Sequence, residues 1–507
     1  MKNFFTLTAL SVALITLAPS IGVADKTQSI TPVQNAPASF ADLAEKLLPS
    51  VVNVSSTQKV EMHDSMGALP EFPEFPEGSP FKDFFEEFMG RRFGSPLDNG
   101  SAAPAASLGS GFIIDADKGL IITNNHVIRD ADEISITLHD DTTVPAEIIG
   151  RDEKVDIAVL KIETKTPLTA VTFGDSADMR VGDWIVAIGN PFGLGGTVTS
   201  GIISARHRDI NSGPYDDYFQ TDASINRGNS GGPMFNMAGE VIGINTAIFS
   251  PSGGSVGIGF AIKSNQAQPL VKQLVEHGRT RRGWLGVRIQ TVTDEIAESL
   301  SLDEPRGALV AGVTDGGPAQ RSKLKMGDII LTFDGKEVST MRSLPRIVAE
   351  TPIDKNVMVE YWRDGRKRKT RVKIGELEKA EDDGLLGGVA DKNINDDEEA
   401  VQDLGQDIDP LGLSVTPLND DIREEYNIDD NIDGVLIIDI DPKSRAAFEG
   451  IDIGDVIVEI NQKQPDNAKD ILDQIRKAKK LRRSSVLLLL NRAGNMRFVA
   501  LALQDDD

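Results

Sequence analysis

The residues best suited to chemistry in this chain form the segment Gly228-Asn-Ser-Gly-Gly-Pro233. A serine between glycines on a tight turn can attack a carbonyl, because glycine tolerates positive φ and leaves room for a substrate beside the hydroxyl. The backbone N–H groups of Gly228, Asn229 and Ser230 can converge on one point and stabilise an oxyanion. Similar small-residue turns occur in plain hairpins, so the segment predicts an acyl-transfer nucleophile only if the chain supplies a general base.

A general base is available at His126, one of five histidines. It follows an apolar, strand-like run and a few polar residues, so we expect a strand end to present its imidazole. His126 is therefore the predicted proton acceptor for Ser230. The other four histidines have loop-like or charged surroundings, which favours surface positions: His63, His139, His207 and His277.

An acid that can orient this histidine is Asp156, which directly precedes the apolar segment 157–160. A carboxylate at the mouth of a buried strand needs a polar partner, and an adjacent imidazole supplies one. Asp152, four residues earlier, is interpreted as a solvated charge. The chain order His126, Asp156, Ser230 is that of chymotrypsin-like proteases, whereas subtilisin-like enzymes and α/β-hydrolases use other orders.

These segments resemble the catalytic blocks of the HtrA (Do/Deg) family of periplasmic PDZ serine proteases, and the resemblance covers nearly the whole mature chain. The matching residues are Thr123-Asn-Asn-His126-Val, Asp156-Ile-Ala-Val-Leu, Gly228-Asn-Ser230-Gly-Gly, Gly189-Asn-Pro-Phe-Gly193 and Gln220-Thr-Asp222-Ala. The similarity is greatest to DegP- and DegQ-like members, because two PDZ-like units follow the protease segment. It implies a mostly β chain, with a chymotrypsin-like double β-barrel followed by two PDZ domains.

The resemblance also implies an activity, the ATP-independent degradation of unfolded or misfolded polypeptides in the periplasm during stress, with accompanying chaperone activity. Ser230 is then the nucleophile, His126 the general base and acid, and Asp156 the residue that holds and charge-balances the histidine. A holdase chaperone without proteolysis is the rival hypothesis, but a degenerate protease would be expected to lose one of these three residues. A membrane-anchored stress sensor would be expected to keep an N-terminal anchor and carry a single PDZ domain.

The primary specificity pocket is predicted from chymotrypsin-like geometry, in which its floor lies shortly before the nucleophile and one wall is the following strand. The floor is then Ser224-Ile225, and the wall is Thr246-Ala247-Ile248-Phe249-Ser250. No acidic residue lies on either segment to pair with lysine or arginine, and Ile225 and Ile248 would narrow the slot. We therefore expect the pocket to accept small or medium aliphatic side chains.

Length and composition bound the remaining possibilities. A chain of 507 residues predicts roughly three domains. A formal net charge of −25 argues against nucleic-acid binding through a global basic face. The sequence has no cysteine, which excludes disulfides and cysteine-bound zinc, and it shows no metal-binding motif. No cofactor is expected.

The N-terminus has the pattern of a secretory signal peptide over residues 1–24. Lys2 is followed by the apolar stretch 4–17 and by the small-residue cleavage pattern Gly22-Val-Ala24. An uncleaved anchor is the alternative, although the apolar stretch is short for a full membrane span. Cleavage would leave no stable transmembrane anchor, so we expect a periplasmic protein.

The protease domain is expected over residues 25–280. Helix 41–48 and strand 51–54 begin it, and many short strands follow, including 134–138, 184–188, 198–203 and 240–249. Helix 266–277, which stops at Gly278, closes it. The polar loop 206–215, which contains Arg208, is expected to touch the first PDZ domain.

A long insertion at residues 55–107 is rich in Pro, Gly, Phe and Glu. A disordered loop is one interpretation of this composition. Its phenylalanines instead favour docking onto a second subunit, which predicts self-association into trimers or larger assemblies. The resemblance implies that this segment regulates the active site and builds oligomers. These phenylalanines are Phe72, Phe75, Phe81, Phe84, Phe85 and Phe88.

The C-terminal part contains an internal repeat of two PDZ-like units, expected at residues 281–374 and 410–507 with an acidic linker at 375–409. Each unit has a glycine loop followed by a Gly-Asp-hydrophobic segment, and the loops are predicted to bind the carboxylate of hydrophobic C-terminal peptides. Two spacer domains that bind nothing are the alternative. Pro410 has no N–H, so we expect the second loop to be the poorer site. The loops are Leu285-Gly286-Val287 and Leu411-Gly412-Leu413.

Overall fold

The computed structural model describes residues 37–58, 105–191, 196–226, 228–249, 255–386 and 405–503. The expected signal peptide, most of the phenylalanine-rich insertion and the centre of the acidic linker lie outside these residues. The chain divides into a unit Met1–Phe40 and a unit Ala41–Asp507. Every element below belongs to the second unit.

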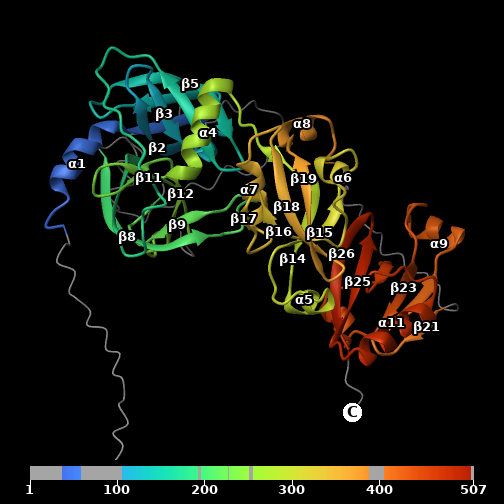
Figure 1. Cartoon of the computed structure of the whole chain (residues 1–507). Coiled ribbons are helices and arrows are strands. Elements are labelled where there is room, and N and C mark those ends of the chain that lie inside the picture. Colours follow the sequence, from blue (N-terminus) through green and yellow to red (C-terminus); the bar gives the residue numbers. More distant parts are fainter. Residues whose placement is uncertain are drawn as a thin grey trace, which may run out of the picture. The chain divides into compact units, whose positions relative to one another are not determined.

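A closed six-stranded barrel forms the first half of the protease region, with the strand order β1-β2-β3-β6-β5-β4 (Figure 1). Branched aliphatic residues from all its strands fill the core. Strand β1 runs four residues beyond the predicted end of the strand, so the insertion is shorter than expected. The elements are α1 (Ala41–Leu47), a 3-10 helix (Leu48–Ser50), β1 (Val51–Gln58), β2 (Ala105–Asp115), β3 (Leu120–Thr123), α3 (Asn125–Ile128), β4 (Glu133–Thr137), β5 (Thr143–Asp152) and β6 (Ile157–Ile162).

A second closed barrel has the order β10-β11-β12-β9-β8-β7. Helix α4 (Ser264–His277) follows it and ends where predicted. Gly278 adopts a left-handed φ of 72° and donates its N–H to the carbonyl of Leu274 at 2.9 Å, which satisfies a terminal carbonyl of the helix. The strands are β7 (Trp184–Gly189), β8 (Thr197–Arg208), β9 (Tyr218–Thr221), β10 (Pro233–Phe235), β11 (Val241–Ile248) and β12 (Gly259–Lys263). The predicted double β-barrel is thus confirmed.

The first PDZ-like unit is a sheet of order β14-β15-β16-β18-β19, with β17 paired to β16. The segment expected to begin the acidic linker instead forms β20, which pairs with β13, and helix α8. The elements are β13 (Gly283–Trp284), β14 (Val287–Thr291), α5 (Asp294–Ser299), β15 (Ala308–Val313), α6 (Pro318–Arg321), β16 (Ile329–Phe333), β17 (Lys336–Glu337), α7 (Ser343–Ala349), β18 (Asn356–Arg363), β19 (Arg366–Lys373), β20 (Gly375–Glu376) and α8 (Leu377–Asp382).

The second PDZ-like unit repeats this succession in a sheet of order β21-β22-β23-β24-β25-β26. Its first strand uses residues that the sequence assigned to the linker. The elements are β21 (Gln406–Ile408), β22 (Leu413–Pro417), α9 (Asp420–Glu425), β23 (Val435–Ile440), α10 (Arg445–Phe448), β24 (Val456–Ile460), α11 (Ala468–Lys480), β25 (Ser485–Arg492) and β26 (Asn495–Ala502).

The repeated Gly-Asp segment has the same structural role in both units. Asp328 and Asp455 are fully buried. Arg363 reaches Asp328 at 2.5 Å, and Arg492 reaches Asp455 at 2.6 Å. A buried carboxylate requires such a charged partner, so the internal repeat marks a structural ion pair in each sheet.

Candidate active site

The predicted general base, His126, lies on a single helical turn that follows β3 directly. Helix α3 buries Asn125, Val127 and Ile128 and leaves His126 exposed. The predicted strand end therefore continues into one helical turn, whose apolar residues anchor the turn in the first barrel. His126 is held at the barrel surface by this packing.

Asp156 lies in the turn between β5 and β6 and has a φ of 61°, an uncommon conformation that aspartate tolerates better than most residues. Its Oδ2 lies 2.7 Å from Nδ1 of His126, and its Oδ1 accepts the backbone N–H of His126 at 2.8 Å. The carboxylate therefore fixes both the position and the tautomer of the imidazole. With Nδ1–H donated to Asp156, Nε2 is the nitrogen that accepts a proton.

Thr246 is a third contact of this pair that the sequence analysis missed. Its hydroxyl donates to Oδ2 of Asp156 at 2.7 Å from strand β11 of the second barrel. The sequence placed Thr246 only in the wall of the specificity pocket. No local signal could identify this role, because the two residues are 90 positions apart.

Ser230 lies between β9 and β10, in a loop packed tightly against the first barrel. A Cβ at Gly231, where φ is 84°, would lie 2.2 Å from the carbonyl oxygen of Ser110. Only glycine, which has no side chain, can lie so close to that carbonyl. The Ser230 hydroxyl donates at 3.4 Å to the carbonyl of Thr246, the residue whose own hydroxyl contacts Asp156.

The candidate oxyanion donors are now fewer than the sequence predicted. The N–H of Asn229 donates to the carbonyl of Asn226 at 3.0 Å, so in this conformation it is engaged within the loop. The N–H groups of Gly228 and Ser230 remain the candidates. Gly228 has a φ of 93°, which allows the loop to turn beside Pro191.

The residues assigned to the specificity pocket differ in exposure. Ile225 is buried in the core of the second barrel, and Ile248 packs against that core. Thr246 and Ala247 are half-buried, whereas Phe249 is exposed. Ser250 lies outside the described residues. The preference for aliphatic side chains therefore stays a prediction that depends mainly on Ile225 and Ile248.

The glycine loops of both PDZ-like units adopt left-handed backbone, with φ of 77° at Gly286 and 65° at Gly412. Leu285 is buried and Val287 half-buried in the first unit, and Leu411 and Leu413 are buried in the second. Peptide binding at either loop remains a prediction.

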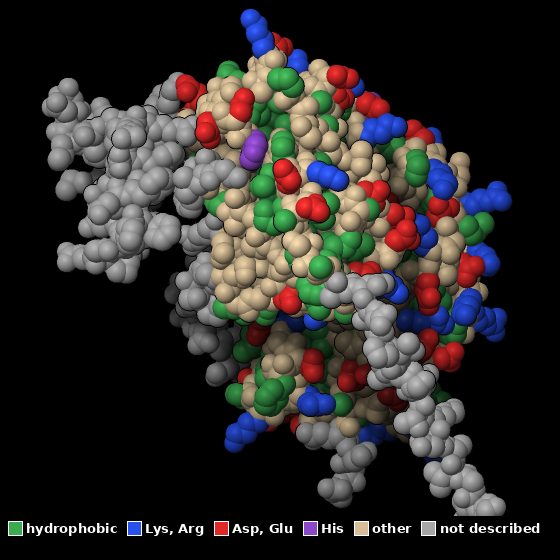
Figure 2. Space-filling view, turned by 90° about the vertical axis from the view of Figure 1, so that its left-hand side faces the viewer, with side chains coloured by type: hydrophobic (Ala, Val, Ile, Leu, Met, Phe, Trp, Pro, Cys, Tyr) green, Lys and Arg blue, Asp and Glu red, His purple; other side chains and the backbone are tan. Residues whose placement is uncertain are grey.

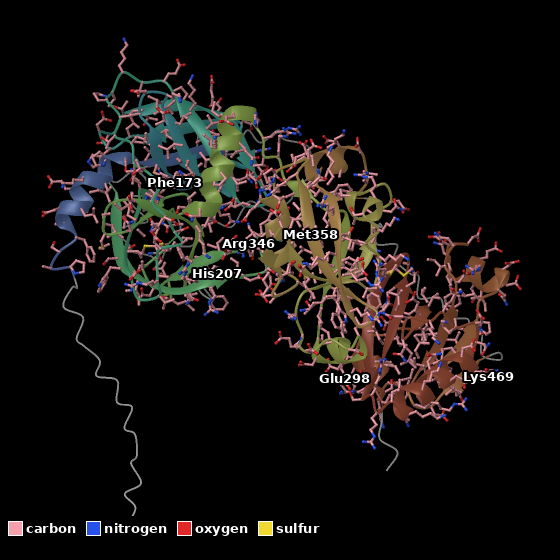
Figure 3. The ribbon with its side chains drawn as sticks, viewed as in Figure 1. Phe173, His207, Glu298, Arg346, Met358 and Lys469 are labelled. Carbon is pink, nitrogen blue, oxygen red and sulfur yellow. The ribbon has the colours of Figure 1, made fainter. Side chains whose placement is uncertain are left out.

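The loop after β8 contacts the first PDZ-like unit, as predicted for residues 206–215, and the contact extends beyond that range to Asp217. Arg342 lies 2.7 Å from Asp209, and Arg346 on helix α7 pairs with Asp217. His207 also contacts Asp217, at 2.9 Å (Figure 3 labels Arg346 and His207). Arg208, which lies in the predicted contact loop, donates to Gln220 of β9 at 2.8 Å.

Asp152 is not the solvated charge that the sequence indicated, because it is only 3% exposed. Its carboxylate pairs with Arg282 at 2.6 Å and accepts the hydroxyl of Thr280 at 2.5 Å. Arg282 also lies over the ring of Tyr215 at 4.9 Å, and burial raises the pKa of Tyr215 to about 12. Arg282 lies between α4 and β13, so this buried pair joins the protease region to the segment that precedes the first PDZ-like unit.

Neither a metal centre nor a membrane span is found in the described part of the chain. No group of three or more His, Asp or Glu side chains there is placed to hold a metal ion, and no helix is sufficiently long and apolar to cross a membrane. Acidic and basic side chains are interspersed on the face shown in Figure 2.

Comparisons with known proteins agree with this geometry. The family described as trypsin-like peptidase domain matches residues 109–244, and the PDZ domain family matches residues 283–374. A probable periplasmic serine endoprotease DegP-like from Brucella melitensis is 45% identical over 493 residues, covering 94% of this chain and 91% of the relative. One with the same description from Rhizobium meliloti is 41% identical over 517 residues and 98% of both chains. The solved HtrA-type protease AlgW with tripeptide has a TM-score of 0.54 and 40% identity, covering 67% of this chain and 97% of that chain.

Proposed function

Because the chain belongs to the HtrA family of serine endoproteases, we propose that it degrades unfolded or misfolded polypeptides in the periplasm without ATP. The observation that best supports its catalytic residues is the double hydrogen bond between Asp156 and His126. That arrangement leaves Nε2 to act as the base, and Thr246, which contacts Asp156, also accepts the hydroxyl of the glycine-bounded Ser230. A serine endopeptidase needs this combination of base, orienting acid and nucleophile.

Catalysis begins when the Ser230 oxygen attacks the scissile carbonyl while its proton passes to Nε2 of His126. Asp156 stabilises the resulting imidazolium, and Thr246 keeps the carboxylate in place. The N–H groups of Gly228 and Ser230 stabilise the oxyanion. His126 then protonates the leaving amine, and water, activated by the same imidazole, releases the acyl group from Ser230.

Substrate selection in this proposal has two parts. Ile225 and Ile248 limit the primary pocket to small or medium aliphatic side chains. The PDZ loops bind hydrophobic C-terminal peptides, with Leu285 to Val287 as the main carboxylate site. Self-association, stress response and chaperone activity complete the proposal and rest on the family resemblance, because the insertion that would assemble subunits lies outside the described residues.

Substitution of the nucleophile tests the protease assignment. Ser230→Ala should lower cleavage of a denatured protein about a million-fold, since the nucleophile, base and acid act as a unit. Ser135→Ala in β4 is the matched control and should cleave at the normal rate. Mass spectrometry of the products should show cuts after aliphatic residues. Unchanged cleavage by Ser230→Ala would refute the assignment, and cuts mainly after Lys, Arg or aromatic residues would refute the pocket.

The same variant separates the protease from the rival chaperone. If Ser230→Ala still suppresses aggregation of the denatured protein, the chain has holdase activity in addition to proteolysis. Aggregation at the rate seen without added protein would remove the chaperone part of the proposal.

A further inference from the structure

A buried serine outside the catalytic residues contacts the nucleophile loop. Ser110 lies on β2 in the first barrel and is fully buried. It is flanked by two glycines with no room for a side chain. A Cβ at Gly109 would lie 2.7 Å from Val127, and one at Gly111 would lie 2.8 Å from the carbonyl oxygen of Ile122. On the Gly109 side the strand also approaches the nucleophile loop, since a Cβ there would lie 3.2 Å from the carbonyl oxygen of Ser230.

The polar atoms of Ser110 contact three segments, two of which carry candidate catalytic residues. Its N–H donates to the carbonyl of Ser230 at 2.8 Å, and its hydroxyl donates to the carbonyl of Gly228 at 2.6 Å. The hydroxyl also accepts the N–H of Asn190 at 2.8 Å. Its carbonyl accepts the hydroxyl of Thr123, three residues before His126, at 2.8 Å.

The bond to Gly228 acts on one particular peptide unit. The carbonyl of Gly228 and the N–H of Asn229 share a rigid plane. This plane lies between the two remaining oxyanion candidates, the N–H groups of Gly228 and Ser230. Gly228 itself resists rotation little, because glycine accepts many backbone conformations. The Ser110 hydroxyl supplies the restraint that the glycine lacks.

We propose that Ser110 is a positioning residue for the nucleophile loop. Its hydroxyl fixes the peptide unit between Gly228 and Asn229 and thereby orients the oxyanion donors on either side. This inference rests on the proposed function of Ser230. The hydroxyl does not touch the reacting atoms and acts only through the oxyanion donors. Its effect should therefore appear in the transition state and in analogues that place an oxygen in the oxyanion position.

If Ser110 had only a structural role, its loss would weaken the binding of boronate and product peptide equally. Ser264 supplies the matched control for the loss of a buried hydroxyl. Ser264, the first residue of helix α4, is 1% exposed, and its hydroxyl donates at 2.7 Å to the carbonyl of Gly174 in the segment between β6 and β7. Ser110→Ala and Ser264→Ala therefore each remove a buried hydroxyl that donates to a glycine carbonyl. Only the first of these carbonyls belongs to the nucleophile loop.

The experiment compares the full-length wild type with both variants. It measures kcat and KM on a fluorogenic aliphatic peptide, and the affinities for a peptide boronic acid and for an unreactive product peptide. The boron accepts the oxygen of Ser230 as the proton leaves for His126, and a boron-bound hydroxyl occupies the oxyanion position. The product peptide binds without forming a tetrahedral centre.

We expect Ser110→Ala to lower kcat about 10- to 100-fold, less than deleting an oxyanion donor outright, with KM unchanged within twofold. Boronate affinity should fall by the same factor and product affinity should not. Ser264→Ala should leave all four quantities within twofold. A normal kcat in Ser110→Ala, or equal weakening of boronate and product, would overturn the inference.

Ser110→Cys covers the case in which the alanine variant does not fold. Because a thiol is a weak donor, kcat should lie between those of wild type and Ser110→Ala, or about tenfold below wild type if only the cysteine variant folds. A wild-type kcat in Ser110→Cys would overturn the inference. Failure of the wild type itself to bind the boronate would refute the proposed function instead, so the two failures are distinguishable.

Discussion

The two PDZ-like units share one glycine-loop pattern but use its backbone differently. In the first unit, the carbonyls of Leu285 and Gly286 accept the N–H groups of Ala319 and Thr314 at 2.9 and 3.0 Å. Among the described residues, the N–H groups of Leu285 and Gly286 have no acceptor. The loop is therefore held through its carbonyls and leaves its donors for a peptide carboxylate.

The second unit uses its loop donors internally. The N–H groups of Leu411 and Gly412 both donate to the carbonyl of Ile408, at 2.9 and 3.0 Å. Pro410, which has no N–H, lies within the same turn. A hydrophobic-glycine-hydrophobic pattern therefore marks the place of a PDZ loop, whereas the preceding turn decides whether the N–H groups of that loop are already bonded.

The two glycine loops should differ most in peptide binding. Proline cannot adopt the φ of 77° at Gly286 or of 65° at Gly412. In a Ser230→Ala background, Gly286→Pro should weaken binding of a labelled hydrophobic decapeptide at least tenfold, about 1.4 kcal/mol. Gly412→Pro should leave the affinity within twofold. Fluorescence anisotropy of the full-length variants measures both.

An amidated copy of the decapeptide is the control, because it lacks the carboxylate that the loop is expected to bind. Equal losses in the two proline variants would show that both loops bind and would remove the contrast. Melting temperatures of both variants identify any loss caused by unfolding.

The stability of the two units should differ less than their peptide affinity, and here substitution in the second loop should have the larger effect. A Cβ at Gly412 would lie 2.4 Å from Cβ of Ser444, whereas one at Gly286 has its nearest neighbours, Trp284 among them, at 3.3 Å. Gly412→Ala should therefore destabilise its unit by about 2 kcal/mol, against about 1 kcal/mol or less for Gly286→Ala. Hydrogen exchange over residues 405–503 and 283–374 of the full chain reports the two effects. Faster exchange in Gly286→Ala than in Gly412→Ala would contradict this order.

The two units should differ least in how their arginines affect the stimulation of cleavage by a bound peptide. Arg342 and Arg346 pair with the loop after β8, and partly exposed ion pairs contribute about 1 kcal/mol or less. Arg342→Ala should lower peptide-stimulated cleavage of a short reporter no more than about fivefold. Arg476→Ala on α11, which removes a pair with Asp473 within the same helix, should not change it. Equal effects of the two substitutions would show that the α7 contact does not transmit peptide binding.

Much of the architecture could be predicted because the relevant signals are local. Short apolar runs separated by turn residues predicted several strands of both barrels, and Gly278 predicted the end of helix α4. The repeat predicted two sheet units of similar order. The predicted linker was too long, because β20 and α8 form from a charged segment whose Glu376 and Glu378 find cationic partners in Arg281 and Arg282. A charge pattern read along the chain does not reveal partners distant in sequence.

The sequence was sufficient to predict which side chains carry the chemistry, since His126, Asp156 and Ser230 lie in motifs with the residue types and chain order of a chymotrypsin-like protease. The contacts that hold these residues became visible only in the folded structure. Thr246 donates a hydrogen bond to Asp156 from the other barrel, Ser110 donates one to the loop of Ser230, and Asp152 forms a buried ion pair with Arg282. Each contact joins positions about 90 or more residues apart. Barrel closure and domain packing set the distances between such residues. A polar residue needs a hydrogen-bond partner only when it is buried, and these residues become buried only when the packed surfaces meet.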